Sequence, residues 1–248
     1  MSYKVVIPAR YESERLPGKP LLKIEGKPML QLTWEKACGS SAEQVIIATD
    51  DARIAEAATK FGANCVMTSR SHRSGTERLH EVALLSNWSA ETVVVNVQGD
   101  EPLIPFDAID LVANNLLANP RAGIATLCEK IVREQEHSDP NAVKVVFSRD
   151  GFAHYFSRAC IPHTGASNPP DRYRHIGIYA YRVEILDQFV SWPVSDLEAT
   201  ENLEQLRALN NGVRIHVDRW EQPMPAGVDT PEDLEALRQL LAETQQSL

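Results

Sequence analysis

Short apolar runs alternate with longer amphipathic stretches along the first half of the chain. The runs have the length of buried strands, and the stretches between them repeat their apolar residues at helical spacing. The predicted strands are 5–7, 44–48, 64–67 and 92–97. The predicted helices are about 28–38, 52–60, a segment opening at 74–77, and about 106–117. Strands and helices that alternate at these lengths predict an α/β fold with a mostly parallel sheet and right-handed crossovers.

The pattern changes after about residue 122. The segment 143–156, with turn residues at 148–151, predicts a β-hairpin. The other predicted elements are a strand at 174–181, a helix at 196–211, a strand at 213–217 and a last helix opening at Thr230-Pro231. We therefore expect a single domain, 1–248, with a mixed α+β insertion at approximately 128–220, after which the final strand and helix return to the main sheet.

The net charge of −9 argues against a general nucleic-acid binder, which is usually basic. Within this acidic chain of 248 residues, the segment 4–27 is locally positive, with six Lys or Arg against three Glu. A positive site in an acidic protein can focus an anionic ligand.

The four cysteines are scattered and form no C-x-x-C pair, so they suggest neither a disulfide framework nor a zinc site. We find no signal peptide and no apolar run long enough to span a bilayer, and we expect a cytoplasmic protein without membrane insertion. The G-x-G-x-x-G and P-loop patterns are also absent, which weakens a dinucleotide or P-loop interpretation.

A basic loop follows the first predicted strand. The strand is expected to break at Pro8, and the loop after it holds Arg10, Arg15 and Lys19, with Gly18 for a tight turn. Open α/β sheets bind ligands at the carboxyl ends of their strands. Because Arg and Lys are suited to phosphate oxygens, the loop predicts a polyphosphate site; the alternative is a solvated surface loop.

Two carboxylates occupy positions suited to a metal ion. Asp100 follows the strand at 92–97, and Asp229 precedes the last helix. Mg²⁺ commonly takes one or two carboxylates together with substrate phosphates, so the pair suits metal-assisted nucleotidyl transfer. Asp100 could instead be a turn former, and Asp229 a solvated loop residue.

Two further segments could bind a ligand or serve the fold alone. Ser74 and Glu77 fit a capping box, although a helix start followed by Gly75 can also approach a ligand. His175 shares one face of a predicted strand with Tyr179, where a polar ligand surface or a purely structural histidine would both fit.

Taken together, these segments resemble the 3-deoxy-manno-octulosonate cytidylyltransferases, the CMP-KDO synthetases, where KDO is the sugar acid. The matching segments are 7–11, 15–20, 74–79, 95–102, 155–158, 175–179, 203–207 and 227–233. The resemblance implies a Rossmann-like nucleotidyltransferase fold and a homodimer. It also implies transfer of CMP from CTP to a 3-deoxy-2-ulosonic acid with Mg²⁺, releasing pyrophosphate, in lipopolysaccharide biosynthesis.

The resemblance also assigns roles to residues of this chain. The implied catalytic residues are Arg10, Arg15, Lys19 and Asp100. The implied nucleotide-binding residues are Ala9, Arg10, Ser13, Arg15, Lys19, Ser74, Gly75, Arg78 and Gln98. The implied sugar-binding residues are Arg158, His175, Tyr179, Glu201 and Gln205. The implied metal ligands are Asp100 and Asp229.

Two segments on the sugar side depart from the common family pattern. The segment 163–170 is shorter than in many members, and 195–201 differs before the Leu-Glu-Gln-Leu-Arg run. An 8-amino variant of KDO is therefore an open substrate. The sequence also leaves open a different sugar acid such as a sialic acid, a polyol phosphate, and a catalytically silent nucleotide-binding homologue.

Overall fold

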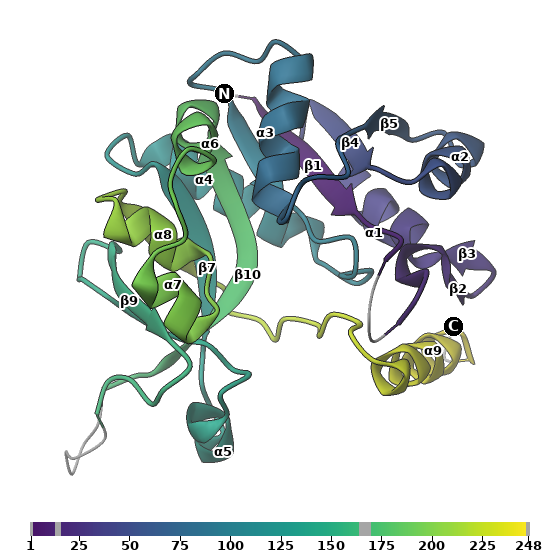
Figure 1. The fold of residues 1–248 in the computed structure, drawn as a ribbon. Coiled ribbons are helices and arrows are strands. Elements are labelled where there is room, and N and C mark those ends of the chain that lie inside the picture. The colour runs from purple at the N-terminus through teal and green to yellow at the C-terminus, as the bar shows by residue number, and fades with distance from the viewer. Residues whose placement is uncertain (1, 13–15, 164–169, 247–248) are drawn as a thin grey trace. The chain divides into compact units, whose positions relative to one another are not determined.

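The computed structural model describes residues 2–12, 16–163 and 170–246 (Figure 1). The chain divides into two compact units, and each is described by itself. The N-terminal unit comprises Ser2–Asn87, Asn96–Asp110 and Pro225–Leu248. The central unit comprises Trp88–Val95 and Leu111–Met224. No helix among the described residues is both long and apolar enough to cross a membrane.

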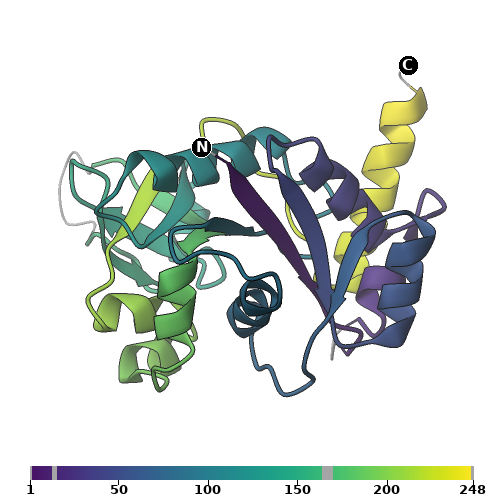
Figure 2. The ribbon, with the colours of Figure 1, turned by 90° about the horizontal axis from the view of Figure 1, so that it is seen from above.

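Three parallel strands form the sheet of the N-terminal unit. They are β1 (Tyr3–Ala9), β4 (Gln44–Thr49) and β5 (Asn64–Met67), with β4 in the middle (Figure 2). The side chains of Val5, Val6 and Ile7 are fully buried, as expected for a strand covered on both faces. The predicted break at Pro8 is wrong: β1 continues to Ala9, and at a strand end the missing donor costs one ladder bond at most.

Helices cover both faces of this sheet. The helices of this unit are α1 (Met29–Cys38), α2 (Ala52–Lys60), α3 (Gly75–Leu85), α9 (Pro231–Gln246) and residues 106–110 of α4 (Phe106–Ala118), whose remainder belongs to the central unit. A short 3-10 helix η1 (Lys19–Leu21) and the hairpin β2 (Lys23–Ile24) with β3 (Lys27–Pro28) precede α1. The ribbon shows α1 and α3 on opposite faces of β1 and β4 (Figure 2). These helices confirm the predicted helical segments of the first half.

The C-terminal helix packs against the segment that follows the first strand. Leu16 lies in one apolar cluster with Val228, Leu234 and Leu237, and Ile24 and Met29 complete it. This cluster holds the end of the basic loop against the segment that carries Asp229. The helix begins as predicted, since the Asp233 backbone N–H donates to Thr230 Oγ1 and the Asp233 carboxylate accepts from the Thr230 N–H.

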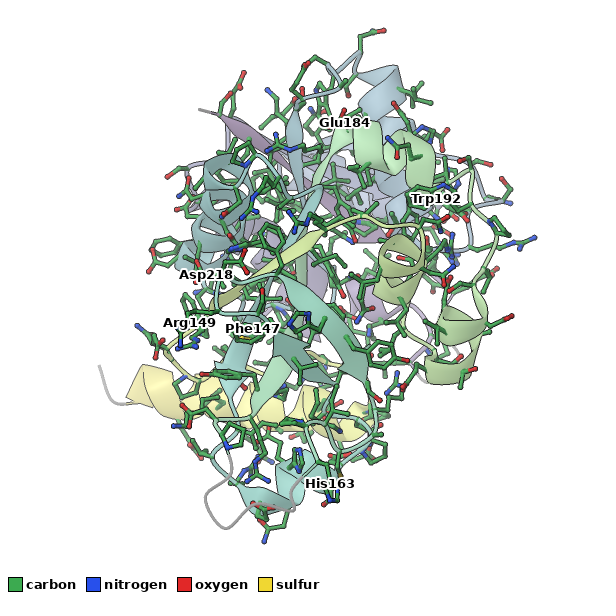
Figure 3. All side chains as sticks on the ribbon, turned by 90° about the vertical axis from the view of Figure 1, so that its left-hand side faces the viewer. Phe147, Arg149, His163, Glu184, Trp192 and Asp218 are labelled. Carbon is green, nitrogen blue, oxygen red and sulfur yellow. The ribbon has the colours of Figure 1, made fainter. Side chains whose placement is uncertain are left out.

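The central unit contains a mixed sheet. Its strands are β6 (Val93–Asn96, whose last residue belongs to the N-terminal unit), β7 (Ile124–Lys130), β8 (Lys144–Phe147), β9 (Ala153–Ser157), β10 (Tyr173–Arg182) and β11 (Ile215–Arg219). β10 pairs antiparallel with β7, β11 pairs parallel with β7, and β8 with β9 forms the predicted hairpin. Figure 3 labels Phe147 on β8 and Asp218 on β11.

Four short helices accompany this sheet, and here the sequence prediction was partly wrong. They are α5 (Glu134–Ser138), α6 (Val183–Phe189), α7 (Asp196–Glu201) and α8 (Gln205–Asn210). The single helix predicted over 196–211 is two helices, because Asn202 adopts a left-handed φ of 51° that ends α7. Strand β7 and the helices α5 and α6 were missed. The expected insertion at 128–220 lies inside Leu111–Met224, and its role as a domain stays a prediction.

Candidate nucleotide site and sugar cluster

A cavity of about 310 Å³ opens at the carboxyl end of β1 in the N-terminal unit. Four segments line it: the end of β1, the start of η1, the start of α3 and the turn after β6. The predicted nucleotide or catalytic residues that it brings together are Ala9, Arg10, Lys19, Ser74, Gly75, Gln98 and Asp100. Glu12 and Arg73 also line it and were missed, although both sit next to predicted residues in the sequence.

A glycine allows two of these segments to approach each other. A Cβ atom on Gly99 would lie 3.0 Å from the carbonyl oxygen of Pro8 and 3.6 Å from Leu30 Cδ1. Because the first of these atoms is backbone, a side chain at Gly99 would push the turn after β6 away from β1. The Gly-Asp pair at 99–100 therefore brings its carboxylate close to the end of the first strand.

Lys19 links the two predicted metal ligands. Its Nζ lies 2.6 Å from Asp100 Oδ2 and 3.0 Å from Asp229 Oδ1, and only 12% of its side chain is exposed. The backbone N–H of Asp229 donates to the Asp233 carboxylate at 3.0 Å, and Val228 N–H donates to the Asp100 carbonyl at 2.9 Å. Two carboxylates far apart in sequence are thus held around one ammonium group.

A third acidic side chain stands beside this pair. Burial, together with the charges of Asp100 and Asp229, raises the pKa of Glu101 to about 7. Near pH 7 the Glu101 side chain therefore keeps its proton for part of the time. No group of three or more His, Cys, Asp or Glu side chains in the described ranges is arranged to hold a metal. Two carboxylates nevertheless suit Mg²⁺, because substrate phosphates and water usually complete its shell.

The start of α3 forms another wall of the cavity. Ser74 Oγ accepts from the Glu77 backbone N–H at 3.3 Å, which confirms the predicted cap. The Glu77 carboxylate accepts from the Arg73 N–H at 2.7 Å, one residue earlier than in a standard capping box. Arg10 is tied to the same region, since its Nη2 donates to the His72 carbonyl at 2.6 Å.

Arg78 lies apart from the cavity wall. Its side chain is fully buried, Nη2 lies 2.9 Å from Asp50 Oδ2, and Nη1 donates to Thr68 Oγ1. A buried guanidinium with a carboxylate partner is well suited to fix the end of β4 beside α3. Ser13 and Arg15, both predicted to bind the nucleotide, lie outside the described residues.

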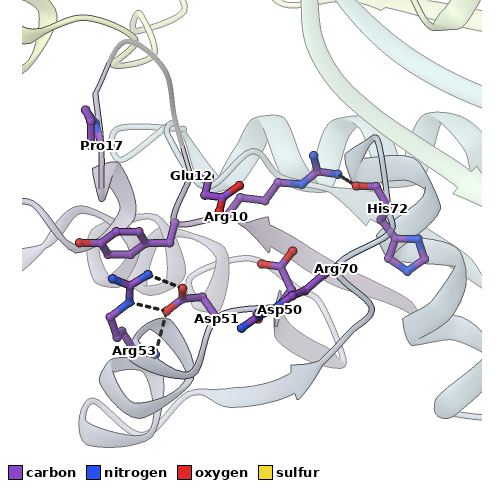
Figure 4. A pocket seen from close by; sticks show the side chains of 9 residues that line it. Arg10, Glu12, Pro17, Asp50, Asp51, Arg53, Arg70 and His72 are labelled. Carbon is purple, nitrogen blue, oxygen red and sulfur yellow. Dashed lines mark hydrogen bonds and ion pairs between the residues drawn. The ribbon is translucent and has the colours of Figure 1, made fainter.

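A larger cavity of about 730 Å³ adjoins Arg10 and Glu12 (Figure 4). Asp50, Asp51, Arg53, Arg70 and His72 also line it. Figure 4 shows the guanidinium of Arg53 paired with Asp51 and the link from Arg10 to His72.

In the central unit, Arg158 and Glu201 contact each other. The Glu201 carboxylate accepts from Ser157 Oγ at 2.6 Å and from the Arg158 backbone N–H at 2.9 Å. The Arg158 guanidinium donates to the backbone carbonyls of Glu201 at 2.7 Å and Pro140 at 2.9 Å. These contacts anchor the start of the segment after β9 to the end of α7.

The other three predicted sugar residues are largely buried. The rings of His175 and Tyr179 lie 5.3 Å apart, on one side of β10 despite a bulge between Ile176 and Tyr179. Burial, with the charge of Arg174, lowers the pKa of His175 to about 3, so the imidazole is neutral near pH 7. Among the described side chains, Gln205 Nε2 is buried without a hydrogen-bond partner, and an unpaired amide can receive a ligand oxygen.

Comparison with known proteins identifies the class of this fold. A family model described as Cytidylyltransferase matches residues 4–215. A solved structure entitled CMP:2-keto-3-deoxy-manno-octonic acid synthetase complexed with CTP superimposes with a TM-score of 0.93 at 40% identity, covering 98% of this chain and 100% of its own. The fold is thus the Rossmann-like α/β fold of a nucleotidyltransferase, as predicted.

Sequence identity to curated relatives narrows the class from nucleotidyltransferases to one family. The 3-deoxy-manno-octulosonate cytidylyltransferase of Pseudomonas syringae pv. syringae (strain B728a) is 56% identical, covering 97% of this chain and 98% of its own. The protein of the same name from Hahella chejuensis (strain KCTC 2396) is 52% identical, covering 98% and 99%. The chain belongs to the 3-deoxy-manno-octulosonate cytidylyltransferase family. The resemblance read from its motifs is confirmed.

Proposed function

We propose that the protein transfers CMP from CTP to the C2 hydroxyl of KDO, releasing pyrophosphate. One observation carries the proposal. The cavity at the end of β1 gathers basic, amide and carboxylate groups from four segments, in a chain 40% identical to a synthetase of known structure with CTP bound. A polyphosphate beside two carboxylates is the arrangement that metal-assisted nucleotidyl transfer uses.

In this reaction the C2 oxygen forms a bond to the α-phosphorus of CTP and loses its proton. The bond between the α-phosphorus and the bridging oxygen breaks, and pyrophosphate leaves with the electron pair. Arg10 and Lys19 would bind the triphosphate and stabilise charge on the leaving group, as would Arg15 by its place in the sequence. Ala9, Ser74, Gly75 and Gln98 would surround the nucleoside, and Arg78 would support this wall through Asp50.

Asp100 and Asp229 would hold Mg²⁺. The contact of both carboxylates with Lys19 Nζ, at 2.6 and 3.0 Å, supports this, because it shows that two anionic oxygen ligands converge on one cationic group. When bound, the ion would reduce repulsion between the attacking oxygen and the phosphates. Lys19 would then be free to move from the carboxylates toward the phosphates.

The sugar acid would contact the cluster in the central unit. The unpaired amide of Gln205 and the neutral imidazole of His175 can bind hydroxyl groups, as can Tyr179 and Glu201. Arg158 is the candidate partner for the sugar carboxylate. The names of the relatives favour KDO over its 8-amino variant.

Pyrophosphate release with Mg²⁺ and CTP tests the reaction, with KDO, its 8-amino variant, a sialic acid and a polyol phosphate supplied in parallel. We expect release with KDO. If release occurred only with the 8-amino variant, a sialic acid or a polyol phosphate, that compound and not KDO would be the substrate. CTP binding without release from any of the four would favour a silent nucleotide-binding homologue.

Three further proposals, on the pathway, the compartment and the oligomeric state, rest on the family resemblance. The product would enter lipopolysaccharide biosynthesis, the reaction would take place in the cytoplasm where CTP is made, and the active form would be a homodimer. Light scattering coupled to size-exclusion chromatography measures the mass in solution and would contradict the homodimer if it gave 27.6 kDa.

A further inference from the structure

An exposed arginine of α2 lies over the base of the loop that carries the phosphate-binding cations. We call residues 10–12 and 16–19 the cation loop. Within it, Arg10 and Lys19 line the nucleotide cavity. Their chain neighbours, Tyr11 and Gly18, close the loop with a hydrogen bond of 3.0 Å from the Gly18 N–H to the Tyr11 carbonyl.

The two closing residues fit each other closely. Gly18 has a φ of 69°, in the left-handed region that favours glycine. A Cβ atom there would lie 3.1 Å from the Tyr11 hydroxyl oxygen, so the tyrosine ring occupies the space beside it. The Tyr11 ring therefore lies against Gly18, at the point where the two ends of the loop meet.

Arg53 covers that ring. Its Cζ lies 3.3 Å from the centroid of the Tyr11 ring, within cation–π distance. The guanidinium is itself fixed, since Nε and Nη2 donate to the two oxygens of Asp51 at 2.9 and 2.6 Å. Asp51 also accepts from the Arg53 backbone N–H at 2.9 Å as the N-cap of α2. The N-terminal end of α2 thus contacts the base of the loop through Arg53.

We propose that Arg53 is a positioning residue for nucleotide binding, which acts by holding Tyr11 and so the spacing of Arg10 and Lys19. The inference rests on the proposed function for its ligand, CTP, and on geometry for the contact itself. Arg53 is 58% exposed, and exposed ion pairs add little to global stability. Its contribution is therefore local: it restricts the positions of Tyr11 and Gly18 before the triphosphate arrives.

Hydrogen exchange measures the contact without any turnover. In Arg53→Ala, the Gly18 amide should exchange about two- to fivefold faster, the range expected for loss of an exposed cation–π contact. The Gly39 amide, which is bonded to Glu35 and Lys36 at the end of α1, serves as the internal reference. Arg53→Lys keeps the charge and loses the fork, so its exchange rate should fall between those of Arg53→Ala and wild type.

Steady-state kinetics then connect the contact to the nucleotide. Arg53→Ala should raise KM for CTP about two- to fivefold, with kcat, KM for the sugar and the unfolding temperature unchanged. Lys60→Ala is the matched control, since Lys60 is an exposed cation of the same helix paired with Glu56. It should leave every value at wild type.

The outcomes separate the two proposals. Unchanged Gly18 exchange in Arg53→Ala overturns the positioning role, and so does faster exchange with an unchanged KM for CTP. Wild-type protein that releases no pyrophosphate from CTP with any sugar overturns the proposed function. In that case isothermal titration of CTP replaces KM, and an unchanged dissociation constant in Arg53→Ala overturns the positioning role.

Discussion

Lys19 Nζ lies 2.6 Å from Asp100 Oδ2, across 81 positions of sequence. The same nitrogen reaches Asp229, so one ammonium group neutralises part of the charge of two carboxylates. A divalent cation and a triphosphate would compete for these same partners. Binding of both would therefore change the contacts of Lys19.

Replacing Asp100 removes one of the two proposed metal ligands. Asp100→Asn keeps the size of the side chain and loses its charge, and we expect turnover to fall by about 100- to 1000-fold. Pyrophosphate release checks the rate, and circular dichroism checks the fold. Asp107→Asn, an exposed acid in the first turn of α4, is the control. Near-normal activity in Asp100→Asn would remove Asp100 from the metal role.

Removing Lys19 should strengthen metal binding while it weakens catalysis. In Lys19→Met, Asp100 and Asp229 lose their shared cation, so Mg²⁺ should bind the nucleotide-free protein about tenfold more tightly. Isothermal titration with MgCl₂ measures this effect without turnover. Lys27→Met, which removes an exposed partner of Glu35, should not change Mg²⁺ affinity. Weaker Mg²⁺ binding in Lys19→Met would contradict a metal site at these carboxylates.

The raised pKa of Glu101 makes stability depend on pH. The folded protein holds its proton up to about pH 7, whereas the unfolded value is 4.5, so unfolding free energy falls as pH rises between these values. The full loss from this group is about 3 kcal/mol. In Glu101→Gln this pH-dependent loss of unfolding free energy should be absent. The difference in unfolding free energy between the variant and wild type should therefore grow from pH 4.5 to 8. Urea denaturation with EDTA measures this, and a constant difference would contradict the shift.

Replacing Gln205 should affect stability and sugar binding in opposite directions, so the two effects can be measured separately. Its buried Nε2 has no partner among the described residues, so Gln205→Leu should raise unfolding free energy by about 1 kcal/mol. If the amide binds the sugar, the same variant should raise KM for KDO about tenfold and leave KM for CTP unchanged. Thermal unfolding and a two-substrate kinetic series give both values. A more stable variant with unchanged KM for KDO would place the sugar elsewhere.

Local pattern was sufficient for most of the N-terminal unit. The strand at 64–67 and the helix at 52–60 were predicted with the bounds of β5 and α2, because apolar periodicity and caps act over a few residues. Prediction from the local pattern failed at Asn202, where a residue with a left-handed φ interrupts a helical pattern. It also failed at Pro8, which β1 accommodates because Pro8 lies near the end of the strand.

The sequence by itself determined the α/β class, the basic loop, the two carboxylates at element ends and the family resemblance. Only the tertiary structure decided which of these groups meet. Lys19 reaches Asp229 across 210 positions, Arg78 pairs with Asp50, and Arg53 covers Tyr11. Such contacts depend on how strands order and helices pack over long separations, and propensity and spacing carry no information at that range.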